Sequence, residues 1–141
     1  MSEKGLSPDR VKHLELIQAI VTRLGNNSFL IKGWTLAIGS AFFVVATNRL
    51  SWKIVAVAFA PIVIFWMLDA FYLRQERLFR KLYDEVRRPQ STVEPFSMDC
   101  SRYWSDVSMF QTFFSVTLRY YYGALFMINF AFLVGALIRI A

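Results

Sequence analysis

Three long apolar runs divide the sequence, and each is about as long as a helix that crosses a bilayer. The runs cover residues 29–48, 52–71 and 120–140. About 20 helical residues, at a rise of about 1.5 Å each, span a hydrocarbon core of roughly 30 Å. The pattern therefore predicts an all-α membrane protein with three transmembrane helices. The short connection between the first two runs makes them an antiparallel hairpin.

The segment before the first run, residues 1–28, has the spacing of an amphipathic helix. It starts with the helix-initiating sequence Ser-Pro-Asp at 7–9. Such a helix either lies in the membrane interface or packs on other cytosolic helices, and its acidic residues favour packing. We expect residues 25–27, Gly-Asn-Asn, to break or bend the chain, and Ser28 to cap the first span. The apolar positions recur at steps of three and four: Val11, Leu14, Ile17, Val21 and Leu24.

The second run continues directly into a charged amphipathic helix that ends at Arg88-Pro89. We expect one helix over residues 52–88, kinked at Pro61, that leaves the bilayer as a basic stalk. Residues 72–104 then form the stalk and a loop within a membrane domain that covers residues 29–141. Two ion pairs are expected at a spacing of four, Glu76 with Arg80 and Asp84 with Arg88.

A basic face of the stalk is the predicted site for an acidic protein partner. Its members are Arg74, Arg77, Arg80 and Lys81.

Asp69 is the acidic residue at the edge of the second apolar run. A carboxylate at the edge of the hydrocarbon is costly unless it is paired. Lys32, in the first turn of the first span, and Arg74 are the candidate partners at similar depth, and a lysine there can extend to the headgroups. We favour a structural ion pair, with a proton- or ion-linked role as the alternative.

After the loop, a helix is predicted to begin at Asp99 or Ser101 and to continue through residues 103–117, with a seam of hydroxyl groups along one face. Both close helix packing and a water-lined pore produce such a seam, and we favour packing. The seam residues alternate at steps of four and three: Ser101, Ser105, Ser108, Thr112 and Ser115.

The third span is predicted to have an aromatic belt and one central amide. The belt is Tyr120-Tyr121-Tyr122 at the start of the span, and Asn129 lies near its midpoint. A lone amide in a membrane seeks a partner across a helix interface, so Asn129 is expected to hold helices together. The first span offers a face of small residues for close helix packing: Gly33, Gly39, Ser40 and Ala41.

Composition supports a membrane protein and weakens the case for an enzyme. Of 141 residues, 56% are hydrophobic and 17% aromatic, and the mean hydropathy is +0.40. His13 and Cys100 are the single histidine and cysteine, which excludes a His/Cys zinc site within one chain. No phosphate-binding loop, nucleophile elbow or metal-ligand cluster is visible. We expect a non-enzymatic protein without a cofactor, and no signal peptide precedes the first span.

The distribution of charge predicts the orientation. The net charge is +6, and 13 of the 16 Lys and Arg residues fall on the side that holds the N-terminus, with Arg49, Lys53 and Arg139 opposite. Positive charge accumulates on cytoplasmic flanks. The N-terminus is therefore predicted to be cytoplasmic and the C-terminus outside, in a bacterial inner membrane. The same flank explains the basic charge without a nucleic-acid partner.

Residues 69–83, DAFYLRQERLFRKLY, together with Asn27-Ser28-Phe29 at the start of the first span, resemble a signature of small multi-pass bacterial inner-membrane proteins. Some members of that group lie in phage-defence gene clusters. The resemblance implies a membrane effector or a membrane-bound sensor subunit. It carries no catalytic or ligand-binding residue over to this chain.

Two function classes follow from these features. The first is a homo-oligomeric membrane protein that perturbs the membrane, or signals from it, in antiviral defence, because three spans form a poor closed bundle and their polar groups need partners. The alternative is an anchor or adaptor that recruits a soluble cytosolic protein through its basic helices. A channel for ions or protons, resting on Asp69, is a third hypothesis.

Overall fold

The computed structural model describes residues 6–48 and 52–138, and these residues form helices and loops without a strand. Three helical segments are long and apolar enough to cross a membrane: Pro8–Ala46, Trp52–Val86 and Val116–Ile138. The all-α fold with three candidate spans is therefore confirmed. The elements are α1 (Pro8–Asn48), α2 (Trp52–Val57), α3 (Phe59–Val86), the 3-10 helix η1 (Ser101–Tyr103), α4 (Met109–Phe113) and α5 (Val116–Ile138).

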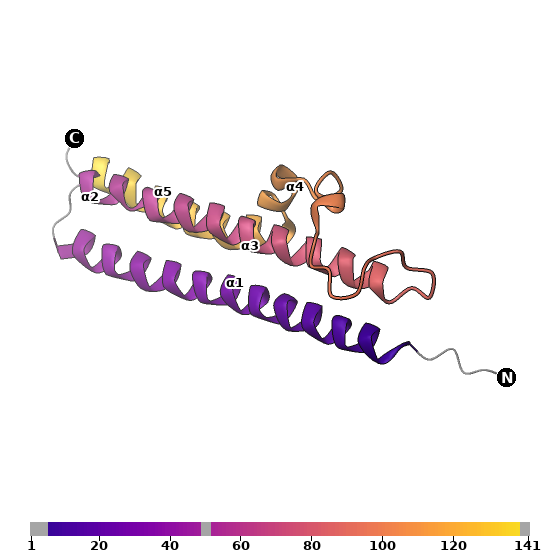
Figure 1. Cartoon of the computed structure of the whole chain (residues 1–141). Helices are drawn as coiled ribbons and strands as arrows, with labels where there is room; N and C mark the ends of the chain where they lie inside the picture. Colours follow the sequence, from indigo (N-terminus) through magenta and orange to yellow (C-terminus); the bar gives the residue numbers. More distant parts are fainter. Residues whose placement is uncertain (1–5, 49–51, 139–141) are drawn as a thin grey trace.

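The two longest helices, α1 and α3, run antiparallel and side by side along most of the molecule (Figure 1). Helix α5 packs on α3 and α2, and the loop after α3 folds back so that α4 lies against α3. Helices α1 and α5 meet mainly through side chains, for example where the ring of Phe43 packs edge-on against that of Phe132 at 4.6 Å. The predicted connection at residues 49–51 lies outside the described residues.

The predicted break at residues 25–27 is wrong, because α1 continues through them as one helix of 41 residues. A glycine inside a helix costs only about 1 kcal/mol relative to alanine. Packing against α3 outweighs that cost, and the Glu76 side chain of α3 reaches Gly25, where a Cβ would be in ordinary contact with its Oε2 at 3.7 Å. Ser28 consequently caps no helix, and its hydroxyl donates to Asp69 instead.

The helix expected over residues 52–88, with a kink at Pro61, is divided into α2 and α3 by an interruption at Ala58. Proline lacks the N–H that would bond to the carbonyl four residues earlier, at Val57, and its ring crowds that turn. Helix α2 ends at that carbonyl. The stalk part of α3 ends at Val86 rather than Arg88, and a loop follows.

The predicted helix over residues 103–117 and its hydroxyl seam are wrong. Ser108 has an extended backbone, with φ −65° and ψ 133°, and its Oγ accepts a hydrogen bond from the Gln111 N–H, so it caps α4 instead of continuing a helix. Thr112 is buried and donates to the Ser108 carbonyl at 2.9 Å. Ser105 is exposed, and Ser115 lies between α4 and α5. Serine side chains that bond to nearby backbone compete with helix formation.

An apolar cluster, here called the stalk cluster, joins the first part of α1 to the end of α3 and to the loop. Because α1 is apolar at every third or fourth position, Ile17 and Val21 face the same side and are buried against α3. The buried members are Ile17, Val21, Leu78, Leu82, Val86, Cys100 and Val107.

Polar contacts from α1 hold the loop over this cluster. The Arg10 guanidinium donates to the carbonyls of Arg88, Pro89 and Ser91 at 3.0, 3.2 and 3.3 Å. Nε2 of the buried His13 lies 2.8 Å from the Ser97 carbonyl, so the tautomer that fits carries a proton on Nε2. The loop is therefore part of the packed stalk.

Surface ion pairs on the stalk match the prediction in one case of two. Glu76 and Arg80 pair at 2.8 Å, as expected. Asp84 pairs with Arg87, three residues away, and Arg88 pairs with Glu85. The predicted pair between Asp84 and Arg88 is therefore wrong, because each of the two residues pairs with an oppositely charged residue that is nearer in the sequence.

Candidate functional site

A buried polar cluster lies where α1, α3 and α5 meet, beside the end of the second apolar run. Its centre is Asp69 of α3, whose side chain is completely buried. Nζ of Lys32 lies 2.5 Å from Asp69 Oδ2, and the hydroxyl of Tyr122 donates to the same oxygen at 3.1 Å. Ser28 donates to Oδ1. The predicted pair of Asp69 with Lys32 is confirmed, and three helices share one carboxylate.

Helix geometry explains how α1 supplies two of these groups. Ser28 and Lys32 are four residues apart and therefore lie on the same face. The Lys32 ammonium also donates to Ser28 Oγ at 2.9 Å, so each group orients the other toward Asp69. The carboxylate accepts from one cation and two hydroxyl groups, and such charge-assisted bonds are stronger than neutral ones.

The prediction that residues 120–122 form an exposed aromatic belt is confirmed only for Tyr120, which is 69% exposed. Tyr121 turns inward, and its hydroxyl donates to the Lys32 carbonyl at 2.7 Å. Tyr122 is buried and also reaches the Phe65 carbonyl at 3.3 Å. Consecutive residues on a helix point about 100° apart, so three tyrosines in a row cannot all face lipid.

Aromatic rings cover the cluster on the side of α4. The indole of Trp66 is stacked between Phe113, at 4.4 Å, and Tyr122, at 5.7 Å. Its Nε1 donates to the Phe113 carbonyl at 3.0 Å. Trp66 therefore holds three elements together at the level of Asp69: α4, the first turns of α5 and the middle of α3.

Three of the four predicted partner-binding cations are engaged within the chain. Arg74 does not reach Asp69: its Nε donates to the Val107 carbonyl at 2.8 Å and its other end to Trp104. Arg80 pairs with Glu76, as described above, and Lys81 pairs with Asp106 at 2.9 Å. The hydrogen bond and charge of Lys81 lower the pKa of Asp106.

The fourth cation, Arg77, is different. It makes no hydrogen bond or ion pair with any residue that the structure describes. It lines a recess on the stalk instead.

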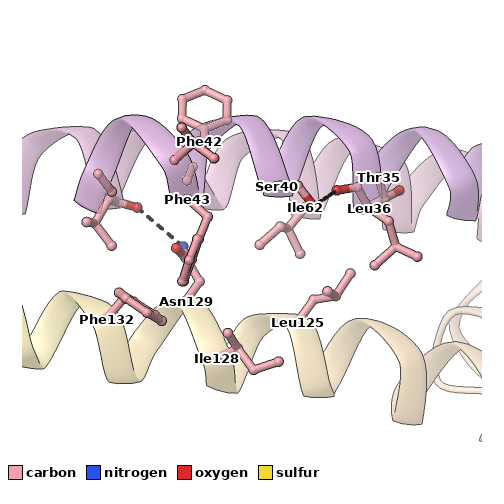
Figure 2. Close-up of a pocket in the computed structure, with 15 residues that line it drawn as sticks. Thr35, Leu36, Ser40, Phe42, Phe43, Ile62, Leu125, Ile128, Asn129 and Phe132 are labelled. Carbon is pink, nitrogen blue, oxygen red and sulfur yellow. Dashed lines mark hydrogen bonds between the residues drawn. The ribbon is translucent and has the colours of Figure 1, made fainter. Parts of the chain in front are cut away.

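A second feature, within the three candidate spans, is an apolar cavity of about 360 Å³ that is lined by residues of α1, α2, α3 and α5 (Figure 2). Asn129 projects from α5 into this space, and its Nδ2 donates to the Val55 carbonyl of α2 at 3.3 Å. The prediction that Asn129 bonds across a helix interface is confirmed. Side chains of Leu36, Phe43 and Phe132 line the cavity with it.

The glycines of the predicted small face of the first span make no close contact with another helix among residues 6–48 and 52–138. A Cβ on Gly33 or Gly39 would meet nothing within 4 Å. Gly39 and Ser40 border the cavity, and the Ser40 hydroxyl donates to the Leu36 carbonyl of its own helix.

Two partners of Asp69, Ser28 and Tyr122, were not predicted from the sequence, and neither was the bond from Tyr121 to the Lys32 carbonyl. The spacing of Ser28 and Lys32 was an available signal, because a hydroxyl one turn before a lysine can share its target. The tyrosines carried a weaker signal, since aromatic residues at a membrane boundary ordinarily face the headgroups.

The loop contains the single thiol. Burial, with a smaller effect from the negative charge of Asp99, raises the pKa of Cys100 to about 11. The thiolate is therefore scarce near neutral pH, and the residue is a poor nucleophile in the folded protein. In residues 6–48 and 52–138, no group of three or more His, Cys, Asp or Glu side chains could hold a metal ion together.

Comparison with protein-family models, with curated proteins and with solved structures finds no match for this chain.

Proposed function

We propose that this chain is a non-enzymatic inner-membrane protein that forms homo-oligomers and acts as an effector or sensor, perturbing the membrane or signalling from it. The observation that supports this is the continuity of two helices across the polar cluster. Helices α1 and α3 run from the stalk cluster past Asp69 into the spans. A displacement of the stalk would then reach the membrane part as a shift of packed helices.

The proposed orientation has the stalk in the cytoplasm, because most of the basic residues lie on that side. A cytosolic signal would act on the stalk, and the spans would respond. The resemblance of residues 69–83 to proteins of phage-defence clusters suggests one setting, in which the response is loss of membrane potential.

Self-association is proposed through the side of the molecule that carries the cavity. The open space beside Gly39, which borders the cavity, would let a helix of a second copy approach closely. Asn129 uses its amide N–H within the chain, and its Oδ1 has no hydrogen-bond partner among the described residues. A donor from a second copy would satisfy that oxygen.

Two variants test whether continuity of α1 matters. Inserting Gly-Ser-Gly between Asn27 and Ser28 interrupts α1, and inserting the same tripeptide after Thr92 lengthens the loop. We expect the wild-type chain to release dye from liposomes and to lower membrane potential when expressed. The helix insertion should abolish both effects, and the loop insertion should retain them. Thermal unfolding and detergent-complex mass serve as folding checks.

An inert, monomeric wild-type protein in both assays would reject the proposal. Equal activity of the two insertions would reject the part that depends on helix continuity. The adaptor alternative predicts a different result, a soluble protein that is captured by the wild-type chain and lost on reversal of the basic stalk residues. It has less support, because three of those four residues bond to other described residues of the chain and Arg77 alone bonds to none of them.

A further inference from the structure

The segment that includes α4 exposes large aromatic side chains although it lies outside the three candidate spans. Trp104, Phe110 and Phe114 are 59%, 72% and 45% exposed. The rings of Phe110 and Phe114 lie 4.8 Å apart and form one continuous apolar surface. Aromatic side chains gather in this way where a protein meets the headgroup region of a bilayer.

Contacts with α3 give the level of this segment along the molecule. At one end Asp106 pairs with Lys81 on the charged stalk, and at the other the Phe113 ring stacks on Trp66 in the apolar run. Between them Arg74 holds the Val107 carbonyl. The segment therefore lies along the part of α3 where the sequence changes from apolar to charged, which is the level of the lipid headgroups.

A recess of about 280 Å³ opens between α3 and this segment at the charged end. Arg77 and Lys81 line it from α3, and Ser108 and Gln111 line it from the other side. Its cations are not all neutralised: Arg80 has Glu76 and Lys81 has Asp106, whereas Arg77 has no partner among the described residues. The recess therefore keeps one net positive charge beside several hydrogen-bond donors.

This combination fits a phosphate group. A guanidinium donates two parallel hydrogen bonds to phosphate oxygens, and an ammonium and an amide nearby can complete the set. The aromatic surface of Phe110 begins next to Gln111 in the same short helix. A ligand with a phosphate and an apolar tail would satisfy both surfaces at once.

We propose that the recess binds the phosphate of an anionic phospholipid in the leaflet on the stalk side, with Arg77 as its main ligand. Phe110 and Phe114 insert among the acyl chains beside it. This inference goes beyond the proposed function, because it assigns a lipid to a site and needs neither oligomers nor membrane perturbation.

The test is lipid retention by the full-length protein, measured by native mass spectrometry in detergent. Phosphatidylglycerol and phosphatidylcholine with identical acyl chains are the probes. We expect the wild-type chain to prefer phosphatidylglycerol. Arg77→Gln should weaken that binding about tenfold, as expected for loss of a charge-assisted contact. Arg87→Gln is the matched control, because Arg87 lies on the same stalk, is 63% exposed and pairs with Asp84 outside the recess.

A second pair of measurements separates a lipid from a free phosphate. Phe110→Ser should also weaken retention of phosphatidylglycerol, and millimolar inorganic phosphate should not displace it. Displacement by inorganic phosphate would overturn the lipid assignment. So would equal retention of the two lipids, or equal losses in Arg77→Gln and Arg87→Gln. Thermal unfolding of each variant in the same detergent, with phosphatidylcholine added, checks that the fold is retained.

Discussion

The two ends of the α1–α3 pair differ in where their ion pairs lie. At the stalk cluster the buried side chains are apolar, such as Ile17 and Leu78, and the ion pairs lie on the surface. At the Asp69 cluster a carboxylate and its polar partners are buried beside apolar residues such as Ala70 and Leu118, and the apolar side chains of Ile64 and Met127 face outward. The same two helices therefore pair by two different rules along their length.

The difference follows from the surroundings of each end. In water, removing apolar surface from solvent drives helices together. Between lipid tails that force is absent, and helices associate through packing and through hydrogen bonds that lipid cannot replace. A carboxylate shared by three helices is one solution to that problem, and an apolar stripe is the solution in water.

The largest expected effect comes from breaking the polar end. Asp69→Ala would leave Lys32 without its counter-ion and Tyr122 and Ser28 without their acceptor. Removing one partner of a buried ion pair costs about 3–5 kcal/mol. We expect a large fall in the thermal unfolding midpoint of the detergent-solubilised protein, measured by tryptophan fluorescence.

Two further variants give that result a control. Asp84→Ala removes an exposed ion pair and should change stability little, by about 0–1 kcal/mol. The double change Lys32→Met with Asp69→Leu removes both charges and should recover at least half of the loss. If the double variant were as unstable as Asp69→Ala, the unpaired lysine would not be the cause.

The next effect concerns the apolar end. Leu78 is completely buried in the stalk cluster, and Leu78→Ala should cost about 2–5 kcal/mol through lost burial and a cavity. Leu68→Ala is the matched control, since Leu68 is on the same helix and 40% exposed. Hydrogen exchange should show faster opening of the first part of α1 in Leu78→Ala alone. Equal protection of the α1 amides from exchange in both variants would contradict the conclusion that the stalk cluster holds the first part of α1 against α3.

The thiol of Cys100 gives a local readout of the same opening. Its pKa of about 11 in the folded chain is above that of a free thiol, so the folded state favours the protonated form. That contribution to stability is complete below the unfolded pKa and is lost as pH rises through the folded value. Labelling by a maleimide at about pH 8 should therefore be slow in the wild-type chain and faster in Leu78→Ala.

A smaller effect is expected for Tyr122→Phe, which removes the hydroxyl shared by Asp69 and the Phe65 carbonyl. Lys32 and Ser28 still satisfy the carboxylate, so the loss should be about 1 kcal/mol. Tyr121→Phe removes one bond to a backbone carbonyl and should cost less. A larger loss in Tyr121→Phe than in Tyr122→Phe would show that the carboxylate is not the centre of the contact.

The features that sequence predicts here are those with a single strong physical cause. Run length gives the spans, apolar spacing gives the stalk face of α1, and the cost of a lone charge predicts that Asp69 needs Lys32. Local signals fail where tertiary contacts compete with them. Gly25 and its two asparagines have the composition of a break, yet contact with α3 keeps them helical.

The seam of hydroxyl groups fails for a different reason. Periodicity describes a helix that has already formed, and it does not reveal that Ser108 uses its hydroxyl to start a new one. The inward turn of Tyr121 and Tyr122 depends on where α5 packs against α3, which no local pattern contains. The positions of Ser108, Tyr121 and Tyr122 therefore depend on tertiary packing, although the sequence shows which hydroxyl groups are available for hydrogen bonds.

The smallest expected effect on stability is that of a substitution at Asn129. Its size tests whether polar contacts stabilise helix packing beyond the Asp69 cluster. Asn129→Leu removes one hydrogen bond to the Val55 carbonyl and adds apolar volume beside the cavity. Hydrogen bonds between membrane helices average about 0.6 kcal/mol, and we expect a change of that size or less in the unfolding free energy. A loss as large as that of Asp69→Ala would mean that polar contacts stabilise helix packing along the whole length of the spans. A small change would mean that the strongly stabilising polar contacts are confined to the level of Asp69, where the stalk joins the spans.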